Sequence, residues 1–122
     1  MDPKSILVVD DEYTSADVLA LVLRDEGFRV TVAANGRQAL ERLAEAAPDL
    51  ILTDLMMPVM NGAEMARAIR AMPRYAKVPI LMTSAVPESA LGAHAAVYDR
   101  FLRKPFDLDA LLGAVRALLD GR

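Results

Sequence analysis

The chain has 122 residues, of which 54% are hydrophobic and 25% are charged, as expected for a single globular domain of residues 1–122 with a sizeable core. Its 14 basic and 17 acidic side chains give a formal net charge of -3 and it has no cysteine, which argues against direct nucleic-acid binding and excludes disulfides and thiolate chemistry. We find no membrane-spanning run and no signal peptide, so we expect a cytoplasmic protein without membrane contact.

Apolar runs alternate with helical periodicity along the whole chain. The predicted strands lie at residues 6–9, 28–32, 50–52, 78–82 and 101–102, and the predicted helices at 15–26, 36–47, 61–72, shortly after Pro87 and at 108–119. Gly27 is expected to end the first helix, because glycine adopts the left-handed conformation at little cost. Asn61 and Glu64 have the spacing of a capping box, and Asp107 is the expected N-cap of the last helix.

Five strand-helix units in succession predict an α/β protein, with a parallel sheet covered by helices on both faces. The strands at 6–9, 50–52 and 78–82 are apolar throughout, as interior parallel strands are, whereas the other two are more polar and fit the edges. This pattern predicts a flavodoxin-like, doubly wound, five-stranded parallel sheet of order 2-1-3-4-5 with five helices.

Charged side chains follow three of these strands directly. Asp10 and Asp11 follow the first strand, Asp54 follows the third and Lys104 follows the fifth. Since the carboxyl ends of parallel strands meet at one edge of a sheet, these four side chains are expected to cluster there. Two carboxylates about 4 Å apart repel by roughly 4 kcal/mol at an effective dielectric near 20, so the cluster needs a cation.

The hard oxygen ligands of this cluster suit Mg²⁺, and a carboxylate can also act as a nucleophile that forms an aspartyl phosphate. Asp10, Asp11 and an aspartyl phosphate would together carry a charge of about -4, to which Mg²⁺ and Lys104 would return about +3. The residue types therefore favour a phosphoryl-transfer site.

With these motifs in order, the chain resembles the receiver domain of two-component response regulators over its whole length, in the manner of stand-alone chemotaxis regulators. The acidic pair of that family falls on Asp10 and Asp11, and its phosphoacceptor on Asp54, within Asp54-Leu55-Met56-Met57-Pro58. Its switch hydroxyl falls on Ser84, its aromatic switch position on Phe101, and its Lys-Pro-Phe motif on Lys104-Pro105-Phe106.

The resemblance implies a role for each of these residues. Asp54 would be phosphorylated. Asp11, Asp54 and the backbone carbonyl of Met56 would ligate Mg²⁺, with Asp10 acting through water. Ser84 and Lys104 would hold phosphoryl oxygens, and Phe101 would rotate inward when they do.

The resemblance also implies partners. The phosphoryl donor would be a histidine kinase or a phosphotransfer protein, and a downstream protein would respond to the switch. Such a domain promotes only its own phosphorylation and dephosphorylation and is not a turnover enzyme. We expect a monomer or a weak dimer, which is either a stand-alone receiver or part of a longer chain.

The chain departs from the family pattern between Ser84 and Lys104, which are only 20 residues apart. This segment is shorter than in typical receivers, and Ala95-Ala96-Val97 replaces the usual small-residue turn that often contains glycine. Met56 and Val86 lie two residues after Asp54 and Ser84, and neither apolar side chain can orient an attacking water. We therefore expect a long-lived phosphoryl group.

Individual residues bear on several alternative readings of the sequence. Thr83 competes with Ser84, since strand alternation lets only one of them face the site. A small aspartate-nucleophile phosphatase needs an acid where this chain has Met56, and a flavodoxin needs a phosphate-binding loop where it has Asp10 and Asp11. A phosphorylation-independent interaction module stays open, and His94 is expected to be a surface helix residue and not a metal ligand.

Overall fold

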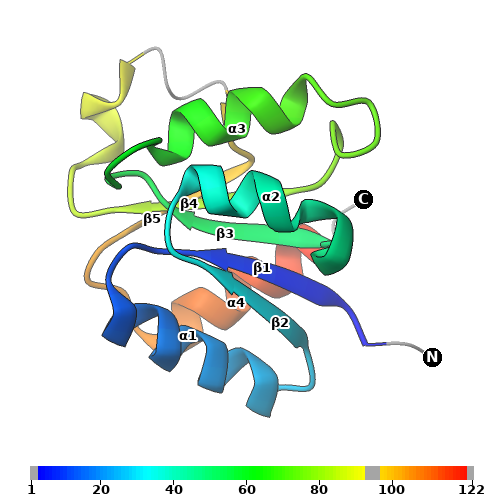
Figure 1. Ribbon diagram of the computed structural model, residues 1–122. Helices are drawn as coiled ribbons and strands as arrows, with labels where there is room; N and C mark the ends of the chain where they lie inside the picture. Colours follow the sequence, from blue (N-terminus) through cyan, green and yellow to red (C-terminus); the bar gives the residue numbers. More distant parts are fainter. Residues whose placement is uncertain (1–2, 93–96, 121–122) are drawn as a thin grey trace.

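Five parallel strands form a single sheet in the computed structural model, which describes residues 3–92 and 97–120 (Figure 1). The strands are β1 (Ser5–Val9), β2 (Arg29–Ala33), β3 (Leu50–Asp54), β4 (Ile80–Ser84) and β5 (Arg100–Arg103). Their order is β2-β1-β3-β4-β5, which confirms the predicted flavodoxin-like topology. The interior strands β1 and β4 are buried along their whole length, whereas the edge strands β2 and β5 are partly exposed.

Helices cover both faces of the sheet, as Figure 1 shows. Helices α1 (Tyr13–Asp25) and α4 (Leu108–Asp120) lie on one face, and α2 (Gly36–Ala46) and α3 (Gly62–Arg70) lie on the other. Alternate residues of each strand feed two separate apolar clusters. In β1, for example, Leu7 points into the cluster beneath α2 and α3, and Ile6 into the cluster beneath α1 and α4.

The predicted helix ends are confirmed. Gly27 follows α1 with a left-handed φ of +96°. The Asn61 side chain accepts a hydrogen bond from the backbone N–H of Glu64, whose carboxylate accepts one from the N–H of Asn61, so the capping box is complete. The Asp107 side chain accepts from the N–H of Ala110 at the start of α4. These local bonds make α3 and α4 begin just beyond the carboxyl ends of β3 and β5.

The expectation of five helices is wrong for the described residues. They contain four α-helices, and the segment after Pro87 forms only the short 3₁₀ helix η1 (Glu88–Ala90). Gly92, two residues beyond η1, has a left-handed φ of +54°. His94, Ala95 and Ala96 lie outside the described residues. Within the described ranges, no helix has the length and apolar character needed to cross a membrane.

The capping box of α3 supports the loop that follows Asp54 and provides a test of this fold. Asn61→Ala is expected to lower the free energy of unfolding by about 1 kcal/mol, because the Glu64 N–H loses its acceptor. Urea denaturation measures this, with Glu45→Ala on the exposed side of α2 as the control, for which a change within about 0.5 kcal/mol is expected. Equal stabilities of the two variants would contradict the capping role.

Candidate functional site

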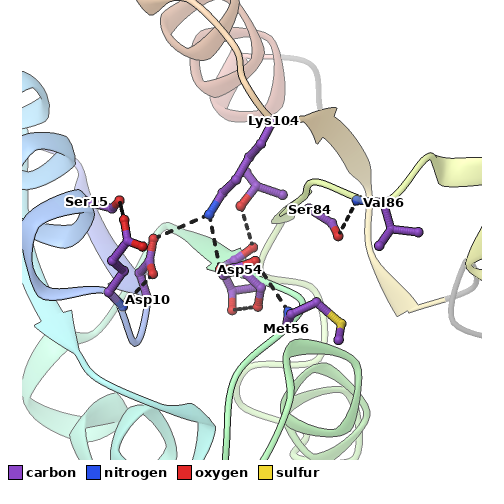
Figure 2. Close-up of polar contacts among 10 residues, drawn as sticks. Asp10, Ser15, Asp54, Met56, Ser84, Val86 and Lys104 are labelled. Atoms are coloured by element: carbon purple, nitrogen blue, oxygen red, sulfur yellow. Dashed lines mark hydrogen bonds and ion pairs between the residues drawn. The ribbon is translucent and has the colours of Figure 1, made fainter.

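The carboxyl ends of β1, β3 and β5 bring three charged side chains together (Figure 2). Lys104 Nζ lies 3.1 Å from Asp54 Oδ2, with which it forms a hydrogen bond, and 3.8 Å from Asp10 Oδ2. Asp10 is only 4% exposed, and Asp54 and Lys104 are half-buried. The predicted convergence of Asp10, Asp54 and Lys104 is therefore present in the structure.

Asp11 completes an acidic cluster. Asp10, Asp11 and Asp54 each offer a carboxylate oxygen, and the three oxygens lie within 4.8 Å of one another. Magnesium-oxygen bonds of about 2.1 Å hold two ligands of one ion at most about 4.2 Å apart. The cluster thus has nearly the size of a magnesium site. Its oxygens lie slightly further apart than direct ligands of one ion can, which suits one carboxylate that reaches the ion through water. The donor set, which consists only of hard oxygens, fits Mg²⁺.

Burial and charge act on the protons of this cluster. Burial raises the pKa of Asp10, and the charges of Asp54 and Asp11 add to this, against a hydrogen bond from the Glu12 N–H and the charge of Lys104. For Lys104, burial alone would lower the pKa, but the charge and hydrogen bond of Asp54 and the charges of Asp10 and Glu12 raise it above its ordinary value. Lys104 is therefore a permanent cation, and the carboxylates lack sufficient compensating charge in the absence of a metal.

Close backbone packing holds Asp54 in place. The Leu55 N–H donates to the carbonyl of Thr83 at 2.8 Å, and the Gly62 N–H donates to the carbonyl of Leu55 at 2.9 Å. A Cβ added to Gly62 would lie 2.4 Å from the backbone oxygen of Asp54, so only glycine fits here. The Met56 N–H points back to Asp54 Oδ1 at 3.3 Å, as Figure 2 shows.

The loop after Asp54 contains an unusual turn. Val59 has a φ of +71°, which is rare for a β-branched residue, and the Met60 N–H donates to the carbonyl of Pro58 at 2.8 Å around it. The side chains of Val59 and Met56 are both exposed, Met56 to 62%. This loop thus presents apolar side chains beside the acidic cluster.

Ser84 and Thr83, which compete for one role, have different partners. The Thr83 hydroxyl donates to the carbonyl of Thr53 within the sheet at 3.4 Å. The Ser84 hydroxyl accepts the N–H of Val86 at 3.1 Å, and the Ser84 carbonyl accepts the N–H of Lys104 at 2.8 Å. Among the described contacts, Ser84 is therefore bonded to the loop beyond β4 and to Lys104, and has no hydrogen bond to Asp54.

Phe101 lies one strand further along the sheet. It pairs with Met82 of β4, is half-buried against the cluster beneath α2 and α3, and contacts the ring of Tyr98 with centroids 5.9 Å apart. It does not contact the acidic cluster in the described interactions. Phe101 lies on β5, beside the strand that ends at Ser84, so a movement of Ser84 can change the surroundings of its ring.

A groove of about 600 Å³ opens beside the charges, a feature that the sequence reasoning missed. Asp10 and Lys104 lie in its wall, and apolar residues from α1 and from the segment before α4 form much of the rest: Val18, Leu19, Pro105, Phe106 and Leu108. Val18 and Leu108 are each 50% exposed. Such exposure of aliphatic side chains can be recognised only once the helices have been placed on the sheet.

Comparison with known proteins points to one family. A family model described as the response regulator receiver domain matches residues 6–116. The DNA-binding response regulator MtrA of Mycobacterium tuberculosis is 43% identical over 117 residues, which cover 93% of this chain and 50% of MtrA. The chain spans about half the length of the curated relatives it matches.

Solved structures give the same result. The chemotaxis response regulator CheY4 of Vibrio cholerae superposes with a TM-score of 0.87 at 35% identity and covers 98% of this chain and 100% of its own. The response regulator TrrA of Thermotoga maritima, solved in complex with Mg²⁺ and BeF, has a TM-score of 0.86 at 32% identity and covers 95% of this chain and 99% of its own.

The crowded carboxylates predict a stability cost that depends on pH. In metal-free buffer at pH 7, Asp10→Asn is expected to raise the free energy of unfolding by an amount on the order of 1 kcal/mol, because it removes a buried charge that is also repelled by Asp54 and Asp11. The raised pKa means that protonated Asp10 stabilises the fold below its ordinary value of 3.8 and that this stability is lost as pH rises through the raised pKa. The advantage of the variant should therefore shrink as the pH falls.

Urea denaturation at a series of pH values measures this effect. Asp17→Asn makes the same chemical change at an exposed position of α1 and should leave stability nearly unchanged. Added Mg²⁺ should stabilise the wild type more than Asp10→Asn, since binding to the folded state shifts the unfolding equilibrium. The prediction is wrong if Asp10→Asn is no more stable than the wild type at pH 7.

Proposed function

The chain belongs to the response regulator receiver domain family, and from this premise we propose that Asp54 accepts a phosphoryl group from a histidine kinase or a phosphotransfer protein in a Mg²⁺-dependent reaction. The modified domain then controls a partner protein. The observation that carries the proposal is the contact of Lys104 Nζ with Asp54 Oδ2 at 3.1 Å inside a cluster of three carboxylates. A purely structural ion pair does not need two further acids.

The proposed reaction is a direct displacement at phosphorus. A carboxylate oxygen of Asp54 attacks the phosphorus of a phosphohistidine, a new P–O bond forms, and the P–N bond breaks with its electron pair going to the histidine nitrogen. Lys104 stays protonated, as its raised pKa supports, and offers its N–H groups to the arriving phosphoryl oxygens. Positioning and charge neutralisation provide most of the catalysis in such transfers.

Magnesium would supply the remaining positive charge when bound. Asp11, Asp54 and the backbone carbonyl of Met56 are the proposed direct ligands, with Asp10 acting through water. The close grouping of the three carboxylate oxygens supports this assignment. TrrA, which is similar in fold and sequence, has been solved with Mg²⁺ and BeF.

Ser84 is the proposed second partner of the phosphoryl oxygens. Its hydroxyl accepts only one described hydrogen bond, from Val86, and so keeps its own hydrogen for donation. Phe101 is the proposed aromatic switch residue, because it sits on β5 beside β4, the strand that ends at Ser84, and three residues before Lys104. Neither residue is a nucleophile in this scheme, and the domain promotes its own modification only.

The apolar groove between α1 and the segment before α4 is the proposed docking place of the phosphoryl donor, since it leads to Asp10 and Lys104. We place the reaction in the cytoplasm and treat residues 1–122 as one receiver domain that is a monomer or a weak dimer. Because the matched relatives are about twice as long as this chain, the downstream output is a partner protein or a further part of a longer chain.

Chemical phosphorylation tests the proposal. Incubation with acetyl phosphate and Mg²⁺ should add the mass of one phosphoryl group to the intact protein, and chelation of Mg²⁺ should prevent the addition. Asp54→Asn should stay unmodified, because an amide is not a nucleophile, while Asp17→Asn should be labelled like the wild type. An unmodified wild type, or equal labelling of Asp54→Asn, would refute the assignment.

The apolar side chains of Met56 and Val86 predict a long-lived modification. The phosphoryl group should persist far longer than seconds after removal of the donor, because neither side chain can orient a water for attack. Met56→Asn should shorten the lifetime severalfold by placing an amide beside Asp54. Intact mass as a function of time gives the decay rate.

Val59→Asn is the matched control in the same loop. It introduces the same amide at an exposed position and suits the left-handed φ of +71° better than valine. Its phosphoryl lifetime should equal that of the wild type. A wild-type half-life of seconds, or equal lifetimes of Met56→Asn and Val59→Asn, would count against the proposed effect.

A further inference from the structure

A side-chain hydrogen bond connects the two described parts of the segment between β4 and β5. The phenol of Tyr98, just before β5, donates to Glu88 Oε2 at 2.6 Å, and Glu88 is the first residue of η1. In Figure 1, the yellow segment that contains η1 stands at the end of the sheet where α3 begins. This is the same end that carries the acidic cluster. No motif in the sequence pointed to this pair.

Tyr98 is joined to the predicted switch residue. Its ring contacts that of Phe101, with centroids 5.9 Å apart and planes inclined by 41°. Both rings pack against the apolar cluster beneath α2 and α3, into which Leu91 of the same segment is also buried. Phe101 therefore cannot change its rotamer without changing its contact with Tyr98.

Glu88 lies close in sequence to Ser84, the other predicted switch residue. The Ser84 hydroxyl accepts the N–H of Val86, and Glu88 follows two residues later. For Ser84 to turn toward a phosphoryl group on Asp54, the backbone from Ser84 to Val86 has to adjust. Glu88 lies only four residues beyond Ser84, so a movement of the backbone there changes the position of the start of η1, where Glu88 lies.

The environment of the phenol keeps it protonated, as a hydrogen-bond donor must be. Partial burial, the hydrogen bond to Glu88 and the charge of Glu88 raise the pKa of Tyr98 to about 12. The phenol is thus a neutral donor to a charged acceptor, which is a stronger arrangement than a bond between neutral groups.

We propose that the Tyr98–Glu88 hydrogen bond is a latch that stabilises the unphosphorylated arrangement of the Ser84 segment and Phe101, with Tyr98 as a positioning residue. The inference rests on the proposed function. Phosphorylation draws Ser84 toward Asp54 and turns Phe101. Glu88 moves with the Ser84 segment and Tyr98 moves with Phe101, so the hydrogen bond between them breaks. Because part of the free energy of phosphoryl binding is used to break this hydrogen bond, the latch lowers the affinity of the site for a phosphoryl group.

Beryllium fluoride with Mg²⁺ is the probe for this coupling, because it mimics a phosphoryl group at a carboxylate. Calorimetric titration of the wild type and of Tyr98→Phe compares their affinities directly. Tyr98→Phe keeps the ring against Phe101 and removes only the hydroxyl. It should bind the probe about three- to tenfold more tightly, the range expected for loss of one solvent-exposed hydrogen bond that opposes binding. Glu88→Ala should show a similar gain.

Two controls separate the latch from general effects of tyrosine loss. Tyr75→Phe makes the same change at a half-buried tyrosine in the segment between α3 and β4 and should bind like the wild type. The double variant Tyr98→Phe/Glu88→Ala should gain no more than either single variant, since both remove the same bond. In the wild type, ¹³C NMR of labelled tyrosine should show the Tyr98 phenol carbon shifting when the probe binds.

The outcomes distinguish the latch from the function on which it rests. If the wild type does not bind beryllium fluoride with Mg²⁺, the proposed function fails and the latch fails with it. If the wild type binds but Tyr98→Phe binds equally well or more weakly, the latch alone is refuted. Additive gains in the double variant would also refute it, because they would show two independent effects.

Discussion

Repulsion among three carboxylates at one edge of the sheet is the constraint on which the rest of the structure depends. Asp10, Asp11 and Asp54 lie within 4.8 Å of one another, and Lys104 is the cation that contacts two of them. At this spacing, like charges cost several kcal/mol even in a polarisable environment. One ammonium cannot offset three carboxylates, so the site favours further positive charge and a metal-assisted transfer of a phosphoryl group. A fold optimised only for stability would not keep this arrangement.

The sheet can hold this arrangement because its interior strands β1, β3 and β4 are almost entirely buried and hydrogen-bonded on both sides. Register pairs β1 with β3 and β3 with β4 over nearly their whole length, so the carboxyl ends cannot separate to relieve the repulsion. Gly62 packs so closely on the backbone of Asp54 that no side chain fits between them. The helix caps at Asn61 and Asp107 then start α3 and α4 just beyond the site. Backbone and core thus hold the charges where mutual repulsion would disperse them.

The strands, their order and the four clustered charges were predictable because they follow from local patterns and one topological rule. Apolar runs define parallel strands, and parallel strands place Asp10, Asp54 and Lys104 at a common edge. The short helix expected after Pro87 is present in the described residues only as the 3₁₀ helix η1, in keeping with its weak apolar pattern. The groove beside Lys104 and the Tyr98–Glu88 bond were missed for another reason. Both arise from side chains far apart in sequence, which meet only through packing.

The burial of the strands and the exposure of the segment after β4 indicate which part of the structure can change conformation with the state of the site. Two conformations interconvert usefully only if a few kcal/mol separate them, and buried strands cannot move at so small a cost. Residues 85–90 are exposed, are joined to Ser84 at one end, and contact Tyr98 through Glu88 at the other. One hydrogen bond thus joins Val86 to Ser84 and another joins Tyr98 to Glu88, and Phe101 lies beside Tyr98. These few hydrogen bonds can rearrange at a small cost in free energy, which makes this stretch the part of the described structure best suited to change with the state of the phosphoryl site.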